Sequence, residues 1–478
     1  MPQKVVVIGA GPAGLTAAAE LIEHGHRVLV LEKDKEYVGG IARTVHYKNY
    51  RFDIGGHRFF SKSSEVTEWW QRRLPSDFIK VRRLSRIFYN GTFFDYPLKA
   101  FNALFGLGVW TSFLCVMSYV WARVNPIKPE KSFADWVSNR FGRRLFSIFF
   151  KTYTEKVWGM PCEEINADWA AQRIKGLSLL SAIWNALIPQ RQKGSDTIKT
   201  LIDQFEYPRL GPGMMWEKTR DDIRQSGNQV LLGMNVVRIH RDGNRVLSVV
   251  TRDANKVETE WAADQFIISM PLRETIRAIV PSLGLEAQAA ANKLTYRDFL
   301  TVALMVKKSN LFPDNWIYVH DASVKLGRIQ NFNNWSPEMV PVEGVTCLGL
   351  EYFCFENDDL WAMSDADLIA LGTRELAQLG LVNAADVFDG AVVRMPKAYP
   401  IYDAEYSQTV ETLRQALGQL ENLQVVGRNG MHKYNNQDHS MMTALLAARN
   451  INGAHFNLWQ VNTDAEYHEA GEAKDLVK

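Results

Sequence analysis

The chain has 478 residues, of which 46% are hydrophobic and 23% charged, a composition typical of a globular protein with two or three domains. Its 55 lysines and arginines nearly balance its 53 aspartates and glutamates, and the net charge of +2 gives no indication of a nucleic-acid partner. The four cysteines lack the spacing of a metal site or a redox pair, and the chain opens on a strand pattern rather than a signal peptide. We therefore expect a cytoplasmic protein without a metal centre.

The first 32 residues have the pattern of a β-α-β unit. Residues 4–8 form a short apolar run of strand length, residues 15–23 fit a helix, and residues 27–31 fit a second buried strand. A glycine-rich turn joins the first strand to the helix, which is the arrangement of a parallel sheet with a right-handed crossover.

That turn reads Gly9-Ala10-Gly11-Pro12-Ala13-Gly14. Its first glycine permits a tight turn, its second lets the backbone approach a pyrophosphate, and its third lets the helix pack closely on the strand. The helix N-terminus then faces phosphate groups, and Glu32 at the end of the second strand can accept hydrogen bonds from ribose hydroxyls. These features together predict a dinucleotide site.

The rest of the chain alternates between helical and strand patterns. The region from residue 97 to 205 is mostly helical, and residues 229–270 are mostly strands with a hairpin at Asp242-Gly243-Asn244. We predict an α/β fold in which one dinucleotide-binding Rossmann domain is built from discontinuous segments, with a helical insertion and an antiparallel-sheet substrate domain. The predicted segments are 1–96, 206–297 and 400–460 for the dinucleotide-binding domain, 97–205 for the helical substrate or cap domain, 298–399 for the antiparallel-sheet domain and 461–478 for a polar tail.

Residues 101–121 carry no charge over a length that could cross a bilayer. Several glycine, serine, threonine and asparagine residues weaken its transfer into lipid, so we predict a buried or surface-docking helix pair rather than a span. Contact with a membrane surface is the alternative, which would place the protein at the inner face of the membrane. The basic residues between Arg72 and Arg86 fit a solvated face, with an anionic substrate or membrane surface as the alternative.

Further glycine-containing motifs indicate whether the predicted dinucleotide is FAD or NAD. Gly39-Gly40-Ile41-Ala42-Arg43 and Asp53-Ile54-Gly55-Gly56-His57 follow the first unit, and Gly427-Arg428 precedes the last helix. This order resembles the amine oxidase and protoporphyrinogen oxidase branch of the glutathione-reductase-type flavoproteins, which implies FAD. The resemblance assigns to the cofactor Gly9, Gly11, Ala13, Gly14, Glu32, Lys33, Gly40, Ile41, Ala42, Arg43, Gly56, His57, Val236, Val237, Met270, Gly427, Arg428, Asn436, Ser440 and Met441.

A second set of motifs resembles the UDP-galactopyranose mutases. It comprises Tyr153-Thr-Glu-Lys-Val-Trp158-Gly with Arg173-Ile174 downstream, Gly327-Arg328, Glu351-Tyr352 and Tyr399-Pro400. The resemblance implies that Tyr153, Trp158 and Arg173 bind the substrate, and that Arg328, Tyr352 and Tyr399 act on its phosphate. It also places His57 beside the flavin or the sugar.

The family's chemistry implies that reduced FAD attacks the anomeric carbon through N5, so that a pyranose and a furanose interconvert without net redox change. The sequence departs from that family where Leu177 replaces a phosphate-binding arginine and Phe60 replaces a histidine. We therefore expect a nucleotide-linked or lipid-linked sugar phosphate used in polysaccharide precursor synthesis.

Two readings compete with this one. Taken singly, Tyr153 and Trp158 also fit core aromatics, and Arg328 also fits a surface ion pair. The alternative function is an FAD-dependent oxidoreductase (an oxidase, desaturase or dehydrogenase) acting on an apolar or amine substrate. A non-catalytic flavin-binding protein would have no need of the substrate motifs. The sequence gives no oligomeric state.

Overall fold

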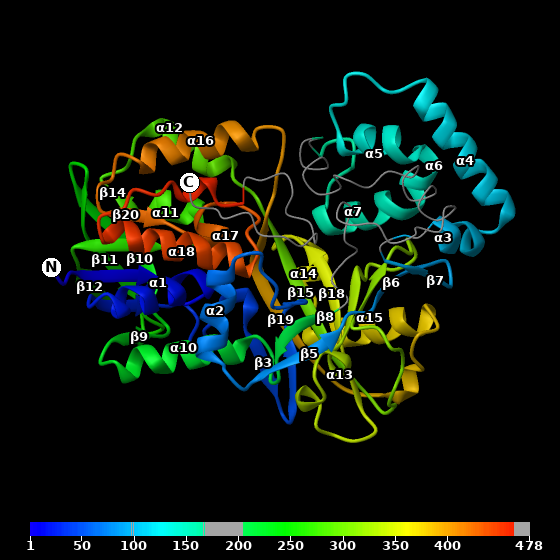
Figure 1. Cartoon of the computed structure of the whole chain (residues 1–478), viewed down its shortest axis with the longest axis horizontal. Coiled ribbons are helices and arrows are strands. Elements are labelled where there is room, and N and C mark those ends of the chain that lie inside the picture. Colours follow the sequence, from blue (N-terminus) through cyan, green and yellow to red (C-terminus); the bar gives the residue numbers. More distant parts are fainter. Residues whose placement is uncertain (97, 99, 166, 168–203, 463–478) are drawn as a thin grey trace, which may run out of the picture.

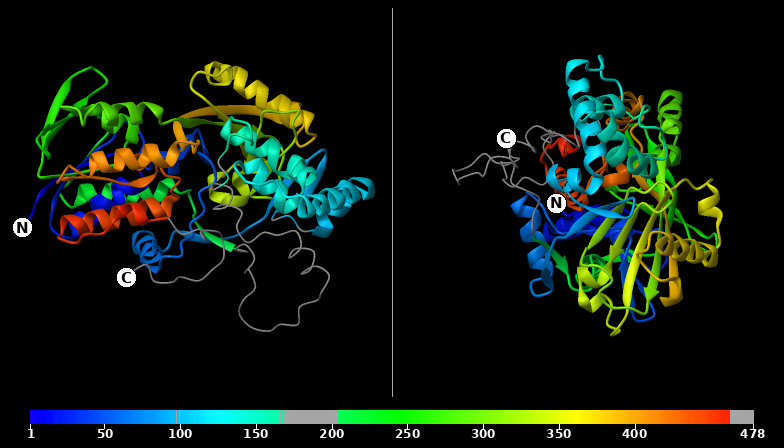
Figure 2. Two further views of the ribbon diagram at one scale, coloured as in Figure 1. Left: turned by 90° about the horizontal axis from the view of Figure 1, so that it is seen from above. Right: turned by 90° about the vertical axis from the view of Figure 1, so that its right-hand side faces the viewer.

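The computed structural model describes residues 1–96, 98, 100–165, 167 and 204–462. It is elongated, with a dinucleotide-type lobe at one end, a helical lobe at the other and a large sheet between them (Figures 1 and 2). Both ends of the described chain belong to the first lobe, so the segments between them form the other two parts.

A five-stranded parallel sheet forms the core of the first lobe, with its strands in the order β20-β13-β1-β2-β9. Its strands are β1 (Lys4–Ile8), β2 (Arg27–Leu31), β9 (Gln229–Leu231), β13 (Gln265–Ile268) and β20 (Leu423–Val425). They are short apolar runs, as expected for a sheet covered on both faces. The covering helices include α1 (Pro12–Glu23), α2 (Ser64–Arg73), α10 (Gly213–Gln225) and α18 (Gln437–Ile451). Three distant parts of the chain therefore build one sheet, which confirms the predicted discontinuous Rossmann fold.

A four-stranded sheet extends this lobe. Its strands are β10 (Asn235–Asp242), β11 (Arg245–Arg252), β12 (Glu258–Ala262) and β14 (Ile279–Val280). The predicted hairpin joins β10 to β11, and Gly243 in its turn has a φ of 53°. The neighbouring helices are α11 (Leu272–Ala278), α12 (Leu285–Lys293), α16 (Tyr406–Leu417) and the short α17 (Gly427–Gly430).

A seven-stranded sheet occupies the middle of the molecule. In spatial order its strands are β19 (Val387–Pro400), β15 (Tyr296–Val306), β18 (Thr346–Cys354), β17 (Arg328–Asn331), β16 (Trp316–Val319), β6 (Ser85–Tyr89) and β7 (Thr92–Asp95). All neighbours are antiparallel except β16 and β6. The strands β6 and β7 fall within residues 1–96, so part of that segment joins the substrate sheet rather than the dinucleotide sheet.

The two faces of this sheet have different neighbours. One face packs against α15 (Asp365–Gln378), and the other faces the hairpin of β3 (Thr44–Tyr47) and β4 (Tyr50–Asp53). Smaller elements complete the region: β5 (Phe78–Arg82) pairs with β8 (Gln204–Pro208), and short helices α13 (Phe332–Trp335) and α14 (Asp359–Ala362) join strands.

The helical lobe contains α3 (Ala100–Leu107), α4 (Val109–Val124), α5 (Phe133–Phe141), α6 (Arg143–Phe146), a π-helical turn (Ser147–Lys151) and α7 (Thr152–Trp158). Its core is aromatic and includes Phe133, Trp136, Phe149 and Trp158. The uncharged stretch at 101–121 forms two helices that break at Gly108, as predicted. Among the described residues, none of the helices has the length and apolar character needed to cross a bilayer.

Candidate active site

Several glycine turns meet at the carboxyl end of the parallel sheet. A side chain at Gly14 would collide with the carbonyl oxygen of Gly9, which forces the first helix turn against the end of β1. A Cβ at Gly427 would lie 2.9 Å from that of Ala13, and one at Gly40 would lie 3.5 Å from Gly11 Cα. The second and third dinucleotide segments therefore close on the first.

Gly11 itself borders open space. It is the N-cap residue of α1 and, as a glycine, has no side chain to cap the helix. Nothing lies within 4 Å of the position that a Cβ would take. The first amides of α1 therefore point at an open cradle, which suits an anionic pyrophosphate.

Glu32 lies at the end of β2 beside this cradle. Its Oε2 accepts a hydrogen bond from the Ala10 amide at 2.6 Å, and its Oε1 accepts one from the Asp34 amide at 2.8 Å. Burial raises the pKa of Glu32. Each carboxylate oxygen keeps a further acceptor position that a ribose hydroxyl could use. The adjacent Lys33 is exposed.

Arg43 reaches the same end of β2. Its Nη1 lies 2.5 Å from Asp34 Oδ2, and its guanidinium stands over the Tyr37 ring at 5.0 Å from the centroid. Its Nε and the Nε2 of Gln437 are both buried without a hydrogen-bond partner among the described residues. Two orphaned donors beside an open glycine cradle fit the acceptor oxygens of a dinucleotide.

The remaining predicted cofactor residues lie on three elements around the cradle. In β10, Val236 pairs with Thr251, whereas Val237 occupies a bulge without a partner in the ladder, which leaves its backbone available. Met270 follows β13 and packs on the lobe core. On the last element, Asn436 caps α18, Ser440 lies in its first turn, and Met441 is buried with its sulfur accepting from the Trp70 indole at 3.0 Å.

The second half of the site is centred on Arg328. Its Nε and its Nη2 both lie 2.5 Å from Glu351 Oε2, and the Glu351 side chain is fully buried. Gln330 Nε2 donates to the other oxygen of Glu351 at 2.7 Å. A Cβ at Gly55 would lie 3.7 Å from Arg328 Nη2, so the second glycine pair lets the backbone pass close to the guanidinium. Among the described residues, Arg328 Nη1 has no hydrogen-bond partner.

A stack of two tyrosines and an arginine borders Arg328. The Tyr399 and Tyr434 rings are 5.7 Å apart and 15° from parallel, and the guanidinium of Arg428 lies over both. Arg428 is fixed because its Nε donates to the Asn435 carbonyl at 2.9 Å. Burial raises the pKa of Tyr399, and the charges of Arg328 and Arg428 both oppose this rise.

His57 follows the second glycine pair. Its Nε2 lies 2.9 Å from the Ile54 carbonyl, which can only accept, so Nε2 carries the hydrogen and Nδ1 is an acceptor. Burial, together with the charges of Arg428 and Arg328, lowers the pKa of His57 to about 4. His57 is therefore a neutral imidazole at neutral pH.

Tyr153 enters the site from the helical lobe. Its ring stacks on His320 at 4.9 Å and 8°, and meets Tyr318 edge-on at 5.4 Å. Arg328 and Tyr399 both contribute to its electrostatic environment. The helical lobe thus supplies an aromatic wall opposite the seven-stranded sheet.

Two cations fix the helix that carries Tyr153. Lys156 Nζ donates to the carbonyls of Val319, Asp321 and Leu326 at 3.3, 2.6 and 3.0 Å. Arg297 donates to the carbonyls of Val157, Lys156 and Phe353, and a Cβ at Gly159 would meet its guanidinium at 2.5 Å. The sequence analysis did not select either residue, although Lys156 lies inside the motif that drew attention to Tyr153.

Three predicted site residues do not join this cluster. Tyr352 is fully buried on the opposite face of the sheet, where its hydroxyl donates to Glu375 Oε2 at 3.0 Å. The residue that reaches Arg328 is its neighbour Glu351, because successive side chains of a strand point to opposite faces. Trp158 lies in the core of the helical lobe. Arg173 lies outside the described residues.

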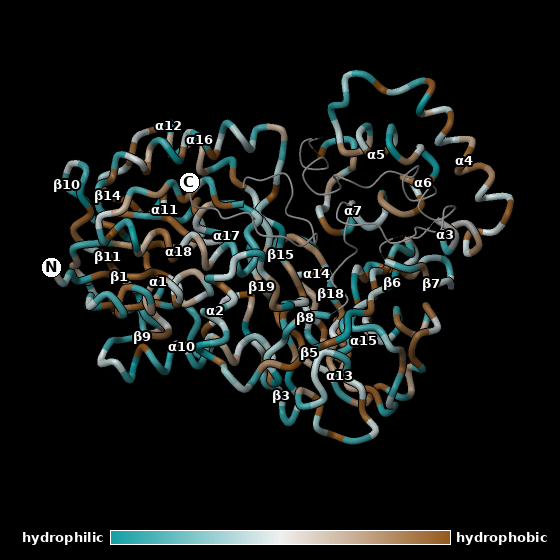
Figure 3. Tube along the Cα trace, in the orientation of Figure 1, coloured by the Kyte–Doolittle hydropathy of each residue, from teal (hydrophilic) through white to brown (hydrophobic). Residues whose placement is uncertain are grey.

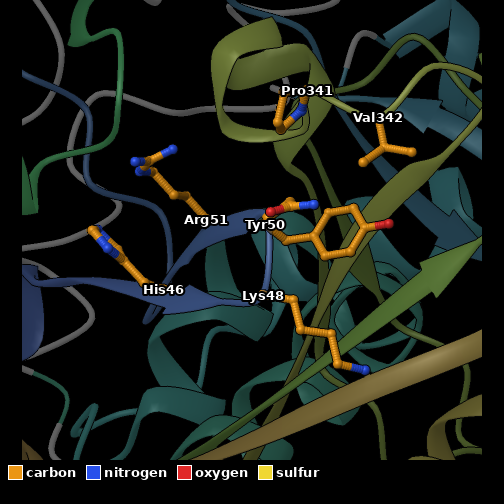
Figure 4. Close-up of a pocket in the computed structure, with 7 residues that line it drawn as sticks. His46, Lys48, Tyr50, Arg51, Pro341 and Val342 are labelled. Carbon is orange, nitrogen blue, oxygen red and sulfur yellow. The ribbon is translucent and has the colours of Figure 1, made fainter.

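A separate cavity of about 400 Å³ lies at the tip of the β3–β4 hairpin. Figure 4 shows the side chains of His46, Lys48, Tyr50 and Arg51 around it, with Pro341 and Val342 on the other side. The hairpin reaches the glycine pair with its other end, and the cavity includes none of the predicted site residues.

A family model described as flavin containing amine oxidoreductase matches residues 12–452. The chain belongs to this family. It is therefore a flavoenzyme, and the dinucleotide cradle with its glycine turns identifies the cofactor as FAD. The residues around the cradle that would hold it are those of α1, β2, β10 and α18 described above.

Solved structures share the fold of this family member. A reduced UDP-galactopyranose mutase is 22% identical, with a TM-score of 0.80 over 96% of this chain and 98% of that one. A putative protoporphyrinogen oxidase from Exiguobacterium is 15% identical, with a TM-score of 0.70 over 94% and 99%. A putrescine oxidase is 14% identical, with a TM-score of 0.62 over 95% and 100%. Mutase and oxidase structures thus share this fold.

Curated relatives match only short stretches. An uncharacterized protein from Methanothermococcus thermolithotrophicus is 52% identical over 54 residues, which is 11% of this chain and 51% of that protein. An L-amino-acid oxidase from Crotalus adamanteus is 44% identical over 68 residues, or 14% of this chain and 13% of that protein. A 1-hydroxycarotenoid 3,4-desaturase from Flavobacterium is 33% identical over 105 residues, 21% of each chain. The matches therefore span between 13% and 51% of the length of these relatives.

Proposed function

We propose that this flavoenzyme is a sugar mutase that interconverts the pyranose and furanose forms of a nucleotide-linked or lipid-linked sugar phosphate. The observation that carries the proposal is the placement of Arg328. A buried carboxylate holds Arg328, and the backbone of the second glycine pair passes close to its guanidinium. Its charge acts on Tyr153, Tyr399 and His57. A fixed cation among aromatic rings suits a phosphate attached to a sugar.

The residues divide the work as follows. Arg328 stabilises the negative charge that develops on the phosphate as it leaves the anomeric carbon. Burial raises the pKa of Tyr153 and of Tyr399, so both phenols remain protonated donors for the sugar or phosphate oxygens. Arg428 lies over the rings of Tyr399 and Tyr434 and fixes that wall of the site.

The chain needs no strong acid or base in this scheme. Bound reduced FAD supplies the nucleophilic chemistry at the anomeric carbon. His57 is neutral, and its hydrogen bond to the Ile54 carbonyl fixes the imidazole where it can orient the cofactor or a sugar hydroxyl. The helical lobe borders the site through the ring of Tyr153, which stacks on His320.

The second candidate is an FAD-dependent oxidoreductase acting on an apolar or amine substrate. The local matches to an L-amino-acid oxidase and a carotenoid desaturase support it. The charge of Arg328 opposes an amine substrate, because an ammonium beside two arginines would be repelled, and an apolar substrate would leave that charge without a partner in the ligand. The mutase proposal explains that charge, and the oxidoreductase proposal does not.

The test is a conversion assay with dithionite-reduced holoenzyme. UDP-galactose and a polyprenyl-diphosphate-linked galactose are supplied separately, and the ring form of the sugar is followed by NMR. We expect ring conversion of at least one donor by the wild-type enzyme and its loss in Arg328→Ala. Arg394→Ala is the matched control, because Arg394 pairs with Asp365 on the α15 side of the same sheet.

Activity that is lost equally in both variants would assign Arg328 a purely structural role. A failure of the wild-type enzyme to convert either donor, while it oxidises an amine or a polyene, would favour the oxidoreductase instead.

A further inference from the structure

Helix α4 exposes most of its large apolar side chains to solvent, whereas an ordinary surface helix buries them. The side chains it turns into the protein are Ser112, Cys115 and Tyr119, which are buried. The side chains it turns outward are large and apolar. Their exposed fractions are 90% for Val109, 72% for Trp110, 52% for Phe113, 40% for Val116, 51% for Met117, 47% for Val120, 69% for Trp121 and 71% for Val124. A surface helix normally has the opposite arrangement.

The apolar face continues beyond α4 at both ends. Phe105 on α3 is 82% exposed, and Ile127 after α4 is 40% exposed. Trp110 and Phe113 stack at 5.8 Å, so the exposed rings form one surface rather than isolated side chains. Single exposed apolar residues are ordinary, but a continuous patch of this kind marks an interaction surface.

Close contacts fix the helix in this orientation. A Cβ at Gly142 would lie 2.7 Å from the Tyr119 amide nitrogen, so the backbones of α4 and the α5–α6 junction touch. The Arg144 amide donates to Ser118 Oγ at 3.1 Å. The apolar face therefore cannot rotate inward without loss of this packing.

Basic residues border the apolar face, and the first acidic residue after it, Glu130, forms an ion pair with Arg140. The sequence from residue 96 to 129 contains no aspartate or glutamate. The basic residues of this border that the structure describes are Arg123, Lys128, Arg143 and Arg144, and all four are exposed. None of them forms an ion pair with another described residue. Arg144 also lines a cavity of about 310 Å³ together with Gly106, Leu107 and Thr111, which places its charge directly against α3 and α4.

We propose that the α3–α4 face docks this enzyme onto a membrane surface that contains anionic lipid. Tryptophan and phenylalanine side chains enter the interface between headgroups and acyl chains, and arginines and lysines at the border contact the headgroups. The 16-residue α4 is about 24 Å long, and one of its faces is attached to protein, so the helix lies along the surface rather than across it.

The alternative occupant is a second copy of this chain. Two such faces would bring their basic borders together without acidic partners, which opposes self-association. An anionic lipid surface satisfies both the apolar face and its charge. Figures 1 and 3 show α3 and α4 at the outer edge of the molecule, at the end opposite the parallel sheet, where a flat surface can reach them.

The test is vesicle flotation of the FAD-loaded protein. We expect it to float with vesicles of phosphatidylcholine and phosphatidylglycerol, and less with phosphatidylcholine alone or at high salt. Trp110→Ser combined with Trp121→Ser should weaken binding by about tenfold or more, since two interfacial rings are lost. Arg143→Gln combined with Arg144→Gln should weaken binding to the anionic vesicles only.

Leu247→Ser with Val257→Ser is the matched control, because these exposed apolar residues lie on β11 and next to β12 of the other lobe. It should bind vesicles as the wild type does. Retained flavin absorbance shows that each variant is folded. A wild type that stays unbound, or a tryptophan variant that floats like the wild type, would overturn the proposal. A dimer in sedimentation that the tryptophan variant abolishes would also overturn it in favour of a second copy.

Discussion

Arg328 and Glu351 stand opposite each other on the antiparallel strands β17 and β18, and two nitrogens of the guanidinium contact one oxygen of the carboxylate. The carboxylate is fully buried, so its negative charge is balanced by an arginine that also borders the site. Glu351 is therefore the residue that positions Arg328.

The first prediction concerns this pair. Glu351→Gln removes the charge that holds Arg328, so the guanidinium should move and transition-state stabilisation should fall. We expect kcat to drop by about tenfold to a hundredfold and the free energy of unfolding to fall by about 3 kcal/mol. Turnover and chemical denaturation measure the two effects. An unchanged kcat in a destabilised protein would show that Glu351 serves the fold alone.

Arg328→Lys tests the geometry of the cation rather than its charge. A lysine keeps the charge but cannot make the two-pronged contacts of a guanidinium. We expect KM for the sugar phosphate to rise by about tenfold with little loss of stability. Steady-state kinetics with Arg394→Lys as the control measures this, and equal kinetics for Arg328→Lys and the wild type would contradict a phosphate contact.

Lys156→Met tests whether the hydrogen bonds of Lys156 hold α7 and the Tyr153 ring in place. The variant loses three hydrogen bonds to the carbonyls of the 319–326 segment, which should free α7 and the Tyr153 ring. We expect lower turnover with unchanged FAD content, together with faster amide exchange in α7. Lys151→Met is the control, since Lys151 on the preceding turn is more exposed and pairs with Glu155 and Glu163. Equal effects of the two substitutions would remove the special role of Lys156.

Asp53 gives the fold a pH dependence. Burial raises its pKa from 3.8 to about 7, although Thr44 and Tyr207 both donate to it. Because the pKa is higher in the folded state, the contribution of this group to stability is complete below 3.8 and is lost as the pH rises through 7. Asp53→Asn cannot ionise, so its stability relative to the wild type should improve between pH 4 and pH 8. Thermal melts across that range measure it, and parallel curves would contradict the raised pKa.

Gly11→Leu separates cofactor binding from folding. A Cβ at this position meets nothing within 4 Å, so the apo fold should tolerate the side chain, which would then occupy the cradle. We expect a folded, colourless protein. Gly25→Leu is unsuitable as a control because of its φ of 82°, whereas Glu68→Leu, at an exposed position of α2, should keep FAD. A yellow Gly11→Leu protein would place the pyrophosphate elsewhere.

The dinucleotide lobe was predictable because its signals are local. The turn after β1, the acidic residue after β2 and the glycine pairs each lie within a few residues of the element they define. Their meeting point follows from the rule that parallel strands end at one edge of the sheet. The strands β6 and β7 were not predicted to join the central sheet. They join it where β6 pairs with β16, and this pairing connects residues that are far apart in the chain.

The catalytic face was harder to predict, and β18 shows why. All nine of its residues are buried, so polarity does not alternate along the strand and gives no indication of which side faces the site. The prediction of Tyr352 instead of Glu351 is wrong by one residue along β18, and successive side chains of a strand lie on opposite faces of the sheet. Lys156 and Arg297 were missed because their partners are backbone carbonyls, which leave no residue-type signal.

The central claim is most directly tested by the redox state of the flavin during turnover. Reduced holoenzyme is mixed with excess sugar phosphate under anaerobic conditions, while NMR follows the ring form and absorbance follows the flavin. A mutase should convert many equivalents of substrate per flavin while the absorbance stays that of reduced FAD. A parallel anaerobic sample of oxidised holoenzyme completes the test. Bleaching of that sample by one equivalent of substrate per flavin, with no ring conversion by the reduced sample, would contradict the account.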